Sequence, residues 1–325
     1  MDKYRFIIVG SGWRAGYYIR IAKALPGVFE LCGVLCRSHE KAELIKNEYG
    51  VNATTCAEDL CLLKPDFVVV CVSKSVGSKV AMEWMDRGFT VLMETPAATD
   101  MDTLSLLYKK ALEGKKAVVA EQYTRYPQYT AILKLLEKKI IGDVSCVNLS
   151  VAHDYHGASL IRAFFGNGTD TGFKLSSKTY SFPTARTLSR YEEFRDGLIE
   201  SKKRRVATME FDNGQVAFYD FDSEQYRSPI RKNTLKLQGS LGEIIDNKVY
   251  YLDEDNNPRQ GTIKIIERIV DRDTDNPNFK RIREIEKIEF EGEVLYTAFF
   301  GLSGLTDDET AIARLMKETA EYALG

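Results

Sequence analysis

The sequence predicts an N-terminal α/β domain with a doubly wound parallel sheet at residues 1–122, and an α+β domain with a mainly antiparallel sheet at residues 123–325. Three observations predict this organisation. The chain of 325 residues is longer than one ordinary hydrophobic core supports. Strand and helix patterns alternate up to residue 120, as in parallel sheets whose strands are joined by helices. After Gly142, most apolar patterns are those of strands.

In the first domain, continuous apolar runs indicate strands that are buried on both faces. Phe6–Val9 ends at a glycine, and Phe67–Val72 is the most apolar strand pattern in the protein. Helical spacing follows the strands and stops at glycine or proline, as at Pro26 and Gly27. Strands are therefore expected at 6–9, 31–36, 67–72, 90–93 and 117–120, and helices at 14–25, 40–49, 76–87 and 103–112.

The second domain is expected to begin with an amphipathic helix and to continue mainly as strands. Val144–Val151 alternates apolar and polar residues, which is typical of a half-buried strand. Asp212–Gly214, of sequence Asp-Asn-Gly, lies between two strand-like runs and predicts a hairpin turn. The expected helices are 127–138, 158–165 and 307–323, and the expected strands are 144–151, 206–211, 216–221, 235–238, 243–246, 248–252, 262–270 and 285–290.

Composition narrows the classes of function. The chain has 45 basic and 47 acidic residues and a net charge of −2, so a generic nucleic-acid-binding surface is not expected. No apolar stretch approaches the roughly 20 residues of a membrane span, and the run at 6–9 is too short for a secretion signal. The six cysteines form no C-x-x-C pair. We therefore expect reduced thiols in a cytoplasmic protein that acts on a small molecule, without nucleic acid or membrane partners.

A glycine-rich turn follows the first strand and opens the first helix. Its first glycine allows a tight turn, its second lets a pyrophosphate approach the backbone, and its final small residue lets the helix pack closely on the strand. This G-x-G-x-x-A pattern predicts a dinucleotide-binding loop, with a plain strand–helix turn as the alternative. Its residues are Gly10, Ser11, Gly12, Trp13, Arg14 and Ala15.

The end of the second strand indicates which dinucleotide is bound. Sites that prefer NAD usually place an acidic residue there, against the ribose hydroxyls. Here the residues are Arg37 and Ser38, and an arginine suits a 2′-phosphate. We therefore expect NADP(H) in preference to NAD(H). The alternative is a surface arginine beside an NAD site.

Matches to one family extend over nearly the whole chain. Besides the glycine-rich turn and the strand at 67–72, they include Met93–Ala98, Glu121–Pro127, Ile141–Val144, Gly239–Glu243 and the acidic start of the last helix. The chain resembles the glucose-fructose oxidoreductase / inositol dehydrogenase / rhizopine-catabolism family, usually written Gfo/Idh/MocA. The resemblance implies a Rossmann domain and an open-faced antiparallel sheet, with the last helix packed back on the first domain. It also implies a homodimer or homotetramer formed through that sheet.

The resemblance also implies roles for residues in the matching segments. Cofactor contacts are implied for Val72, Ser73, Glu94, Thr95 and Gln122. Contacts with a polyol or an acidic substrate are implied for Tyr123, Arg125, Tyr126 and Arg162, for which packing at a domain interface is the alternative. Residues 226–229 form a further segment that could reach the substrate cleft.

The chain departs from the family at positions that carry chemistry. Thr95 stands where the family has the lysine of a Glu-Lys-Pro motif, and a threonine hydroxyl cannot carry that lysine's charge or proton. Gly77 stands where a histidine is common, and Ala152 stands where the second-domain motif has an aspartate. His156 fits the histidine of that motif.

The remaining candidates for proton transfer are His153, Asp154 and His156. Oxidation of an alcohol needs a group that takes the hydroxyl proton, and histidine titrates near neutrality. We expect His156 to be the acid–base residue, with His153 or Asp154 orienting it or holding a substrate hydroxyl. The alternative is that His156 caps a helix and His153 packs at a strand end. The His-x-x-His spacing is also compatible with a metal site. The sequence shows no fourth ligand beside it, so no metal is expected.

These observations lead to one main hypothesis and two alternatives. The main hypothesis is an NAD(P)-dependent oxidoreductase that transfers hydride between nicotinamide and a small polyol, sugar or related carbonyl compound. The first alternative is a catalytically silent homologue that binds a dinucleotide and acts as a regulator or binding protein. The second is a relative that uses a tightly held cofactor transiently, without net redox change.

Overall fold

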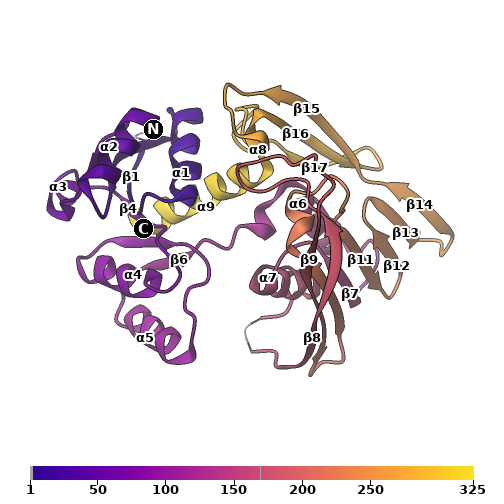
Figure 1. Cartoon of the computed structure of the whole chain (residues 1–325). Helices are drawn as coiled ribbons and strands as arrows, with labels where there is room; N and C mark the ends of the chain where they lie inside the picture. The colour runs from indigo at the N-terminus through magenta and orange to yellow at the C-terminus, as the bar shows by residue number, and fades with distance from the viewer. Residues whose placement is uncertain (1–2, 169) are drawn as a thin grey trace. The chain divides into compact units, whose positions relative to one another are not determined.

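A computed structural model describes residues 3–168 and 170–325, and it divides the chain into two compact units (Figure 1). The first unit is Met1–Arg125 together with Ser303–Gly325, and the second is Tyr126–Leu302. The C-terminal segment therefore belongs to the unit that is formed by the start of the chain.

The first unit contains a parallel sheet of strand order β3-β2-β1-β4-β5-β6. Its strands are β1 (Tyr4–Val9), β2 (Phe29–Leu35), β3 (Ala53–Thr54), β4 (Phe67–Val70), β5 (Thr90–Met93) and β6 (Ala117–Val119). Its helices are α1 (Trp13–Ala24), α2 (His39–Tyr49), α3 (Ala57–Cys61), α4 (Gly77–Asp86), α5 (Met101–Leu112), the 3-10 helix η1 (Tyr123–Arg125) and α9 (Asp307–Leu324). This strand order is that of the doubly wound Rossmann fold, so the expected fold class is confirmed.

The apolar runs of β1, β4 and β5 are buried because helices cover both faces of the sheet. On one face, alternate residues such as Ile7 and Val68 pack with Leu60 of α3, Trp84 of α4 and Leu107 of α5. Helix α9 packs against α1, β4 and β5. A helix from the end of the chain thus completes the cover of a sheet built from its beginning.

The second unit is built on a sheet of strand order β14-β13-β12-β11-β7-β10-β9-β8, in which β7 and β10 pair in parallel and the other neighbours pair antiparallel. The strands are β7 (Val144–Ser150), β8 (Phe173–Ala185), β9 (Ile199–Phe211), β10 (Val216–Asp222), β11 (Thr234–Gly239), β12 (Gly242–Ile245), β13 (Lys248–Leu252) and β14 (Pro258–Thr262). A second sheet contains β15 (Lys264–Asp271), β16 (Arg281–Phe290) and β17 (Glu293–Thr297). The helices are α6 (Pro127–Glu137), α7 (Asp154–Phe165), η2 (Ser223–Tyr226) and α8 (Pro277–Lys280). The expected α+β class with a mainly antiparallel sheet is confirmed.

The elements of the second unit differ from the expectations in several places. Strand β9 begins at Ile199 rather than at residue 206, and β17 was not expected. Strand β8 was not expected, because it is an edge strand whose residues are nearly all exposed and show no core-facing pattern. The expected strand at 262–270 is two strands, β14 and β15, separated at Ile263. Helix α7 begins at Asp154 rather than at residue 158. The hairpin expected at 212–214 is confirmed, since β9 and β10 pair on either side of it.

The large sheet has one face packed against its own unit and one open face. Helix α7 contacts β7, and the inward residues of the strands, such as Leu149 and Tyr219, are buried. The register places Val206, Phe218, Ile245 and Tyr250 on the opposite face, where each is more than one-third exposed. Among the described residues, no helix combines the length and apolar composition that a membrane crossing requires.

Candidate cofactor site and histidine cluster

A pocket of about 600 Å3 lies in the first unit at the carboxyl ends of β1, β2 and β4. Ligands of open parallel sheets bind at such ends, where the order of the strands reverses. Six of the expected cofactor-binding residues line this pocket: Gly10, Ser11, Gly12, Arg37, Val72 and Ser73. The fold therefore brings together segments that follow three separate strands.

The geometry of the glycine-rich turn fits a bound pyrophosphate. Gly10 has a φ of +124°, and a Cβ atom there would lie 2.6 Å from the Cys71 carbonyl oxygen. Gly12 is the N-cap residue of α1 and provides no side-chain cap, and a Cβ atom there would meet nothing within 4 Å. The positive end of α1 therefore opens onto free space, which is the arrangement that binds phosphate groups in proteins.

Two cations line the end of the pocket that follows β2. Arg37 is exposed, and Lys41 lies in the first turn of α2. Ser38 is not among the lining residues. Its hydroxyl caps α2 by accepting a hydrogen bond from the Lys41 amide at 3.3 Å. None of the described residues that line this pocket carries a carboxylate. The sequence analysis did not predict that Lys41 and Thr55 line the pocket. Lys41 could have been predicted, because it lies in the first turn of the helix that follows Arg37.

Two buried thiols form part of the pocket wall. Burial raises the pKa of Cys36, and the hydroxyl of Ser11 opposes this effect only in part. Burial also raises the pKa of Cys71 well above its usual range. Both side chains are therefore neutral at physiological pH and act as small apolar wall groups. The structure has all six cysteines as free thiols.

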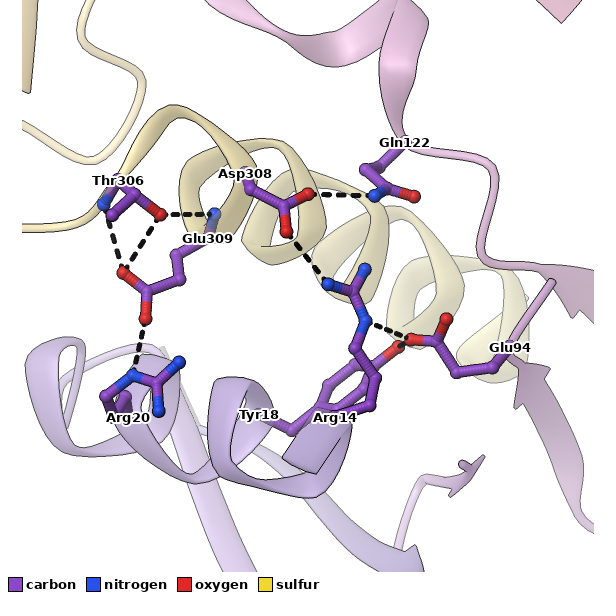
Figure 2. Close-up of polar contacts among 8 residues, drawn as sticks. All are labelled: Arg14, Tyr18, Arg20, Glu94, Gln122, Thr306, Asp308 and Glu309. Carbon is purple, nitrogen blue, oxygen red and sulfur yellow. Dashed lines mark hydrogen bonds and ion pairs between the residues drawn. The ribbon is translucent and has the colours of Figure 1, made fainter. Parts of the chain in front are cut away.

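Arg14, Glu94 and Gln122 do not line this pocket, and hydrogen bonds connect them through a network that includes Asp308 (Figure 2). Arg14 Nε donates to Glu94 Oε1 at 2.8 Å, and Arg14 Nη1 donates to Asp308 Oδ2 at 2.8 Å. Asp308 Oδ1 accepts a hydrogen bond from Gln122 Nε2 at 2.8 Å. Tyr18 adds a hydroxyl that donates to Glu94 Oε1 at 2.5 Å. We call Arg14, Tyr18, Glu94, Gln122 and Asp308 the Asp308 network.

The residues of the Asp308 network are partly shielded from water, and their mutual contacts shift the pKa values of Arg14 and Tyr18. Burial alone would lower the pKa of Arg14, but Glu94 and Asp308 outweigh burial and raise it well above its usual range. Burial and the nearby Glu94 raise the pKa of Tyr18, which remains a hydrogen-bond donor. The guanidinium of Arg14 is therefore a permanent cation between two carboxylates.

The other expected residues of the first unit do not line the pocket. Trp13 packs edge-on against Tyr17, with ring centroids 4.7 Å apart, and Ala15 is fully buried. Thr95 is half-buried and directly follows Glu94 in the chain. Tyr123 is buried in η1, and Arg125 forms an ion pair with Glu318 of α9.

In the second unit, the fold brings the two candidate histidines together at the start of α7. His153 is the N-cap residue of this helix, and the ring centroids of His153 and His156 are 4.8 Å apart. The Tyr226 hydroxyl accepts a hydrogen bond from the His153 amide at 2.9 Å and also bonds to Nδ1 of the same residue. His156 is only 6% exposed, whereas His153 is half-buried. Tyr226 belongs to the segment that sequence reasoning placed near the cleft.

Asp154 and two of the expected substrate residues are occupied by other contacts. The Asp154 carboxylate forms an ion pair with Arg205 and not with a histidine, and its amide donates to the Tyr219 hydroxyl. Tyr126 is the N-cap residue of α6 and its ring packs near Tyr129. Arg162 donates to the carbonyl oxygens of Gly168 and Thr171. No group of three or more metal-ligating side chains occurs among the described residues.

The geometry of the first unit agrees with a comparison to known families. Residues 4–123 match the family model described as an oxidoreductase family with an NAD-binding Rossmann fold, Gfo/Idh/MocA. The match spans strands β1 to β6 of the Rossmann unit. The expectation drawn from the sequence resemblance is thereby confirmed. A search of curated proteins found no match to the chain.

Solved structures of oxidoreductases share the fold of this chain over most or all of its length. An oxidoreductase from Sinorhizobium meliloti has 17% identity and a TM-score of 0.63, covering 99% of this chain and 89% of its own. An oxidoreductase from Agrobacterium radiobacter, in complex with NAD+, L-tartaric acid and magnesium, has 13% identity and a TM-score of 0.63, covering 100% and 90%. The WlbA dehydrogenase from Chromobacterium violaceum, in complex with NADH and UDP-GlcNAcA, has 16% identity and a TM-score of 0.55, covering 77% and 76%. At these identities the likeness establishes the fold.

Proposed function

We propose that this protein is an NAD(P)-dependent oxidoreductase that transfers hydride between nicotinamide and a small polyol, sugar or related carbonyl compound. The observation that carries the proposal is the pocket above the glycine-rich turn, where Gly10 and Gly12 leave room for a pyrophosphate at the start of α1. When bound, the cofactor supplies the hydride chemistry, and this chain supplies binding, orientation and proton transfer. Related structures hold NAD+ with tartaric acid and NADH with a nucleotide sugar, which supports a small oxygenated substrate.

NADP(H) is the proposed cofactor, in preference to NAD(H). Two cations, Arg37 and Lys41, line the pocket where the ribose next to the adenine lies in this fold. A 2′-phosphate would form charge-assisted hydrogen bonds with both, whereas the ribose hydroxyls of NAD would find no carboxylate among the described lining residues. The two cations support the preference independently of the family, whose model is described as NAD-binding.

Proton transfer is assigned to the paired histidines of the second unit. His153 and His156 lie side by side, and Tyr226 holds the backbone and ring of His153. A neutral imidazole can accept the proton of a substrate hydroxyl, and it can return that proton in the reverse direction. Asp154 is left out of this assignment because it pairs with Arg205.

A catalytically silent binding protein is the second candidate, and Thr95 favours it. The residue follows Glu94 at the point where the family places its lysine, and it offers only a hydroxyl. This candidate predicts tight cofactor binding without turnover. In such a protein, Thr95→Lys would be the substitution most able to create turnover.

The open face of the large sheet supports a homo-oligomer. Exposed apolar side chains from four strands, Val206, Phe218, Ile245 and Tyr250, share this face. A homodimer or homotetramer would bury them. Light scattering on the wild type and on Phe218→Glu tests this, with dissociation of the variant as the expected result.

The experiment that tests the function combines calorimetry with a turnover screen. NADPH and NADH are titrated into the wild type, Arg37→Ala and Lys41→Ala, with Lys46→Ala as the control because Lys46 lies in α2 but pairs with Glu43. Loss of each phosphate contact should weaken NADPH binding about tenfold or more and leave NADH binding within about twofold. The same samples are screened with polyols, sugars and keto acids by the absorbance of reduced nicotinamide.

Each outcome of this experiment has a definite meaning. Turnover that is lost in His153→Gln or His156→Gln supports the oxidoreductase and identifies the acid–base residue. Tight binding with no turnover on the whole panel supports the silent binding protein. If neither dinucleotide binds the wild type, both candidate functions fail.

A further inference from the structure

We propose that Asp308 sets the hydrogen-bonding direction of the Gln122 side chain, so that the first unit presents a buried acceptor to a ligand that carries an N–H or O–H donor. This inference rests on the proposed function, since the donor assigned below belongs to the cofactor. Asp308 is thus a positioning residue, and it comes from the opposite end of the chain to the glycine-rich turn.

The direction of the Gln122 amide follows from the donors and acceptors around it. A guanidinium can only donate, and a carboxylate paired with it can only accept. Arg14 donates to Asp308 Oδ2, so Asp308 Oδ1 also accepts, and the group of Gln122 that faces it must be the NH2 group. The Gln122 Oε1 atom therefore points away from Asp308, as Figure 2 shows.

The Gln122 Oε1 atom is a buried acceptor without a hydrogen bond among the described residues. The side chain is 4% exposed, and a buried polar group left unpaired costs free energy. Such groups in native proteins are normally paired with protein, ordered water or a ligand. The unpaired atom is an acceptor, so its missing partner is a donor.

The topology indicates which donor this is. Gln122 follows β6 and Glu94 follows β5, whereas the glycine-rich turn and Arg37 follow β1 and β2. In this fold a dinucleotide crosses the carboxyl ends of the strands, with its pyrophosphate at the turn after β1. The adenosine half lies towards β2, so the nicotinamide half lies towards β5 and β6. Its carboxamide NH2 is the donor that we assign to Gln122 Oε1, and a substrate hydroxyl is the other source of the same chemistry.

An isosteric substitution inverts this arrangement. In Asp308→Asn, the Arg14 guanidinium can bond only to the Asn oxygen, which turns the new NH2 group towards Gln122. Gln122 must then present its oxygen to residue 308 and its own NH2 group to the ligand. The double variant Asp308→Asn/Gln122→Glu restores an outward acceptor, because the new carboxylate accepts from residue 308 with one oxygen and faces the ligand with the other.

The test measures binding rather than activity. NAD+ and 3-acetylpyridine adenine dinucleotide, in which a methyl group replaces the carboxamide NH2, are titrated by calorimetry. The wild type should bind NAD+ about tenfold more tightly than the analogue, because only NAD+ satisfies the buried acceptor. Asp308→Asn should lose this discrimination, and the double variant should recover it.

The control is Glu309→Gln, which changes a different contact between α9 and α1. Glu309 is fully buried and pairs with Arg20 at 2.6 Å, and its carboxylate points towards Arg20 and Thr306 (Figure 2). This variant should keep the discrimination even if its stability falls. Urea unfolding, followed by fluorescence of the two tryptophans, verifies that each variant is folded.

The outcomes separate this inference from the proposed function. Discrimination that is unchanged in Asp308→Asn, or lost equally in Glu309→Gln, overturns the role of Asp308. Equal affinity of the wild type for both dinucleotides overturns the carboxamide as the donor. If the wild type binds neither of these dinucleotides nor NADPH, the proposed function fails together with the inference.

Discussion

Arg14 Nη1 lies 2.8 Å from Asp308 Oδ2, although 294 positions separate the two residues in the sequence. The contact joins the first turn of α1, just after the glycine-rich turn, to the first turn of α9. It shows that the end of the chain is part of the Rossmann unit and helps to set the geometry next to the cofactor pocket.

Replacement of Arg14 should destabilise the first unit strongly. Arg14→Met removes the cation that lies between Glu94 and Asp308, two carboxylates that are each less than one-quarter exposed. The expected loss in the free energy of unfolding is about 2–4 kcal/mol. Tryptophan fluorescence in urea measures it, because Trp13 and Trp84 both lie in the first unit. Arg5→Met is the matched control, since the exposed Arg5–Glu30 pair should contribute less than about 1 kcal/mol.

The two glycines of the turn should respond differently to alanine. Gly10→Ala introduces a Cβ atom 2.6 Å from a backbone oxygen at a φ of +124°, so it should cost about 2 kcal/mol or more of stability. Gly12→Ala meets open space, so its stability should change by less than about 1 kcal/mol while dinucleotide affinity falls about tenfold or more. Urea unfolding and calorimetry on both variants measure these quantities. Unchanged affinity in Gly12→Ala would place the pyrophosphate elsewhere.

Stability should fall at alkaline pH. Burial raises the pKa of Cys71 well above its usual range, and burial with Glu48 raises the pKa of Tyr49 to about 12. In the unfolded chain these groups titrate at about 8.5 and about 10, so above pH ~8.5 the unfolded state binds fewer protons than the folded state. Their contribution is therefore complete below pH ~8.5 and is lost as pH rises towards 12. Unfolding free energies between pH 7 and 11 should show this decline, with a smaller slope above pH ~8.5 in Cys71→Ala.

The Tyr226 hydroxyl should fix the tautomer of His153. The hydroxyl accepts from the His153 amide and bonds to Nδ1 of the same residue. We expect it to donate its own proton to Nδ1, which would leave the ring proton of a neutral imidazole on Nε2. Tyr226→Phe should give a mixture of the two tautomers. Nitrogen-15 NMR can resolve this, because the chain has only three histidines. A wild-type ring already in mixed tautomers would contradict the assignment, and the His39 signal serves as the internal control.

Much of the fold could be predicted from local patterns. The buried runs at Phe6–Val9 and Phe67–Val70 and the glycine-rich turn between strand and helix are contiguous signals, and the structure has strands and turn at those places. Strand β8 could not be predicted, because it is held by pairing with β9 and not by a buried face of its own. Its residues show no apolar periodicity from which a strand could be predicted.

The candidate site was predictable where its residues adjoin a strand end. Gly10, Ser11, Gly12 and Arg37 line the pocket because each follows directly on a strand whose carboxyl end is at the same edge of the sheet. The assignments of Arg14, Glu94 and Gln122 to direct cofactor contacts were drawn from position alone. Sequence position does not show that these three side chains are bonded within the Asp308 network.

The sequence by itself determined the strand–helix alternation, the glycine-rich turn and the pairing of two histidines three residues apart, because each is set by neighbouring residues and by backbone geometry. Only the tertiary structure decided that α9 returns to the first unit, that Asp308 joins Arg14 to Gln122, and that Tyr226 meets His153. These contacts join residues 73 to 294 positions apart. Such pairings depend on the burial of whole helices and strands, and that free energy is distributed over the core rather than encoded in a local pattern.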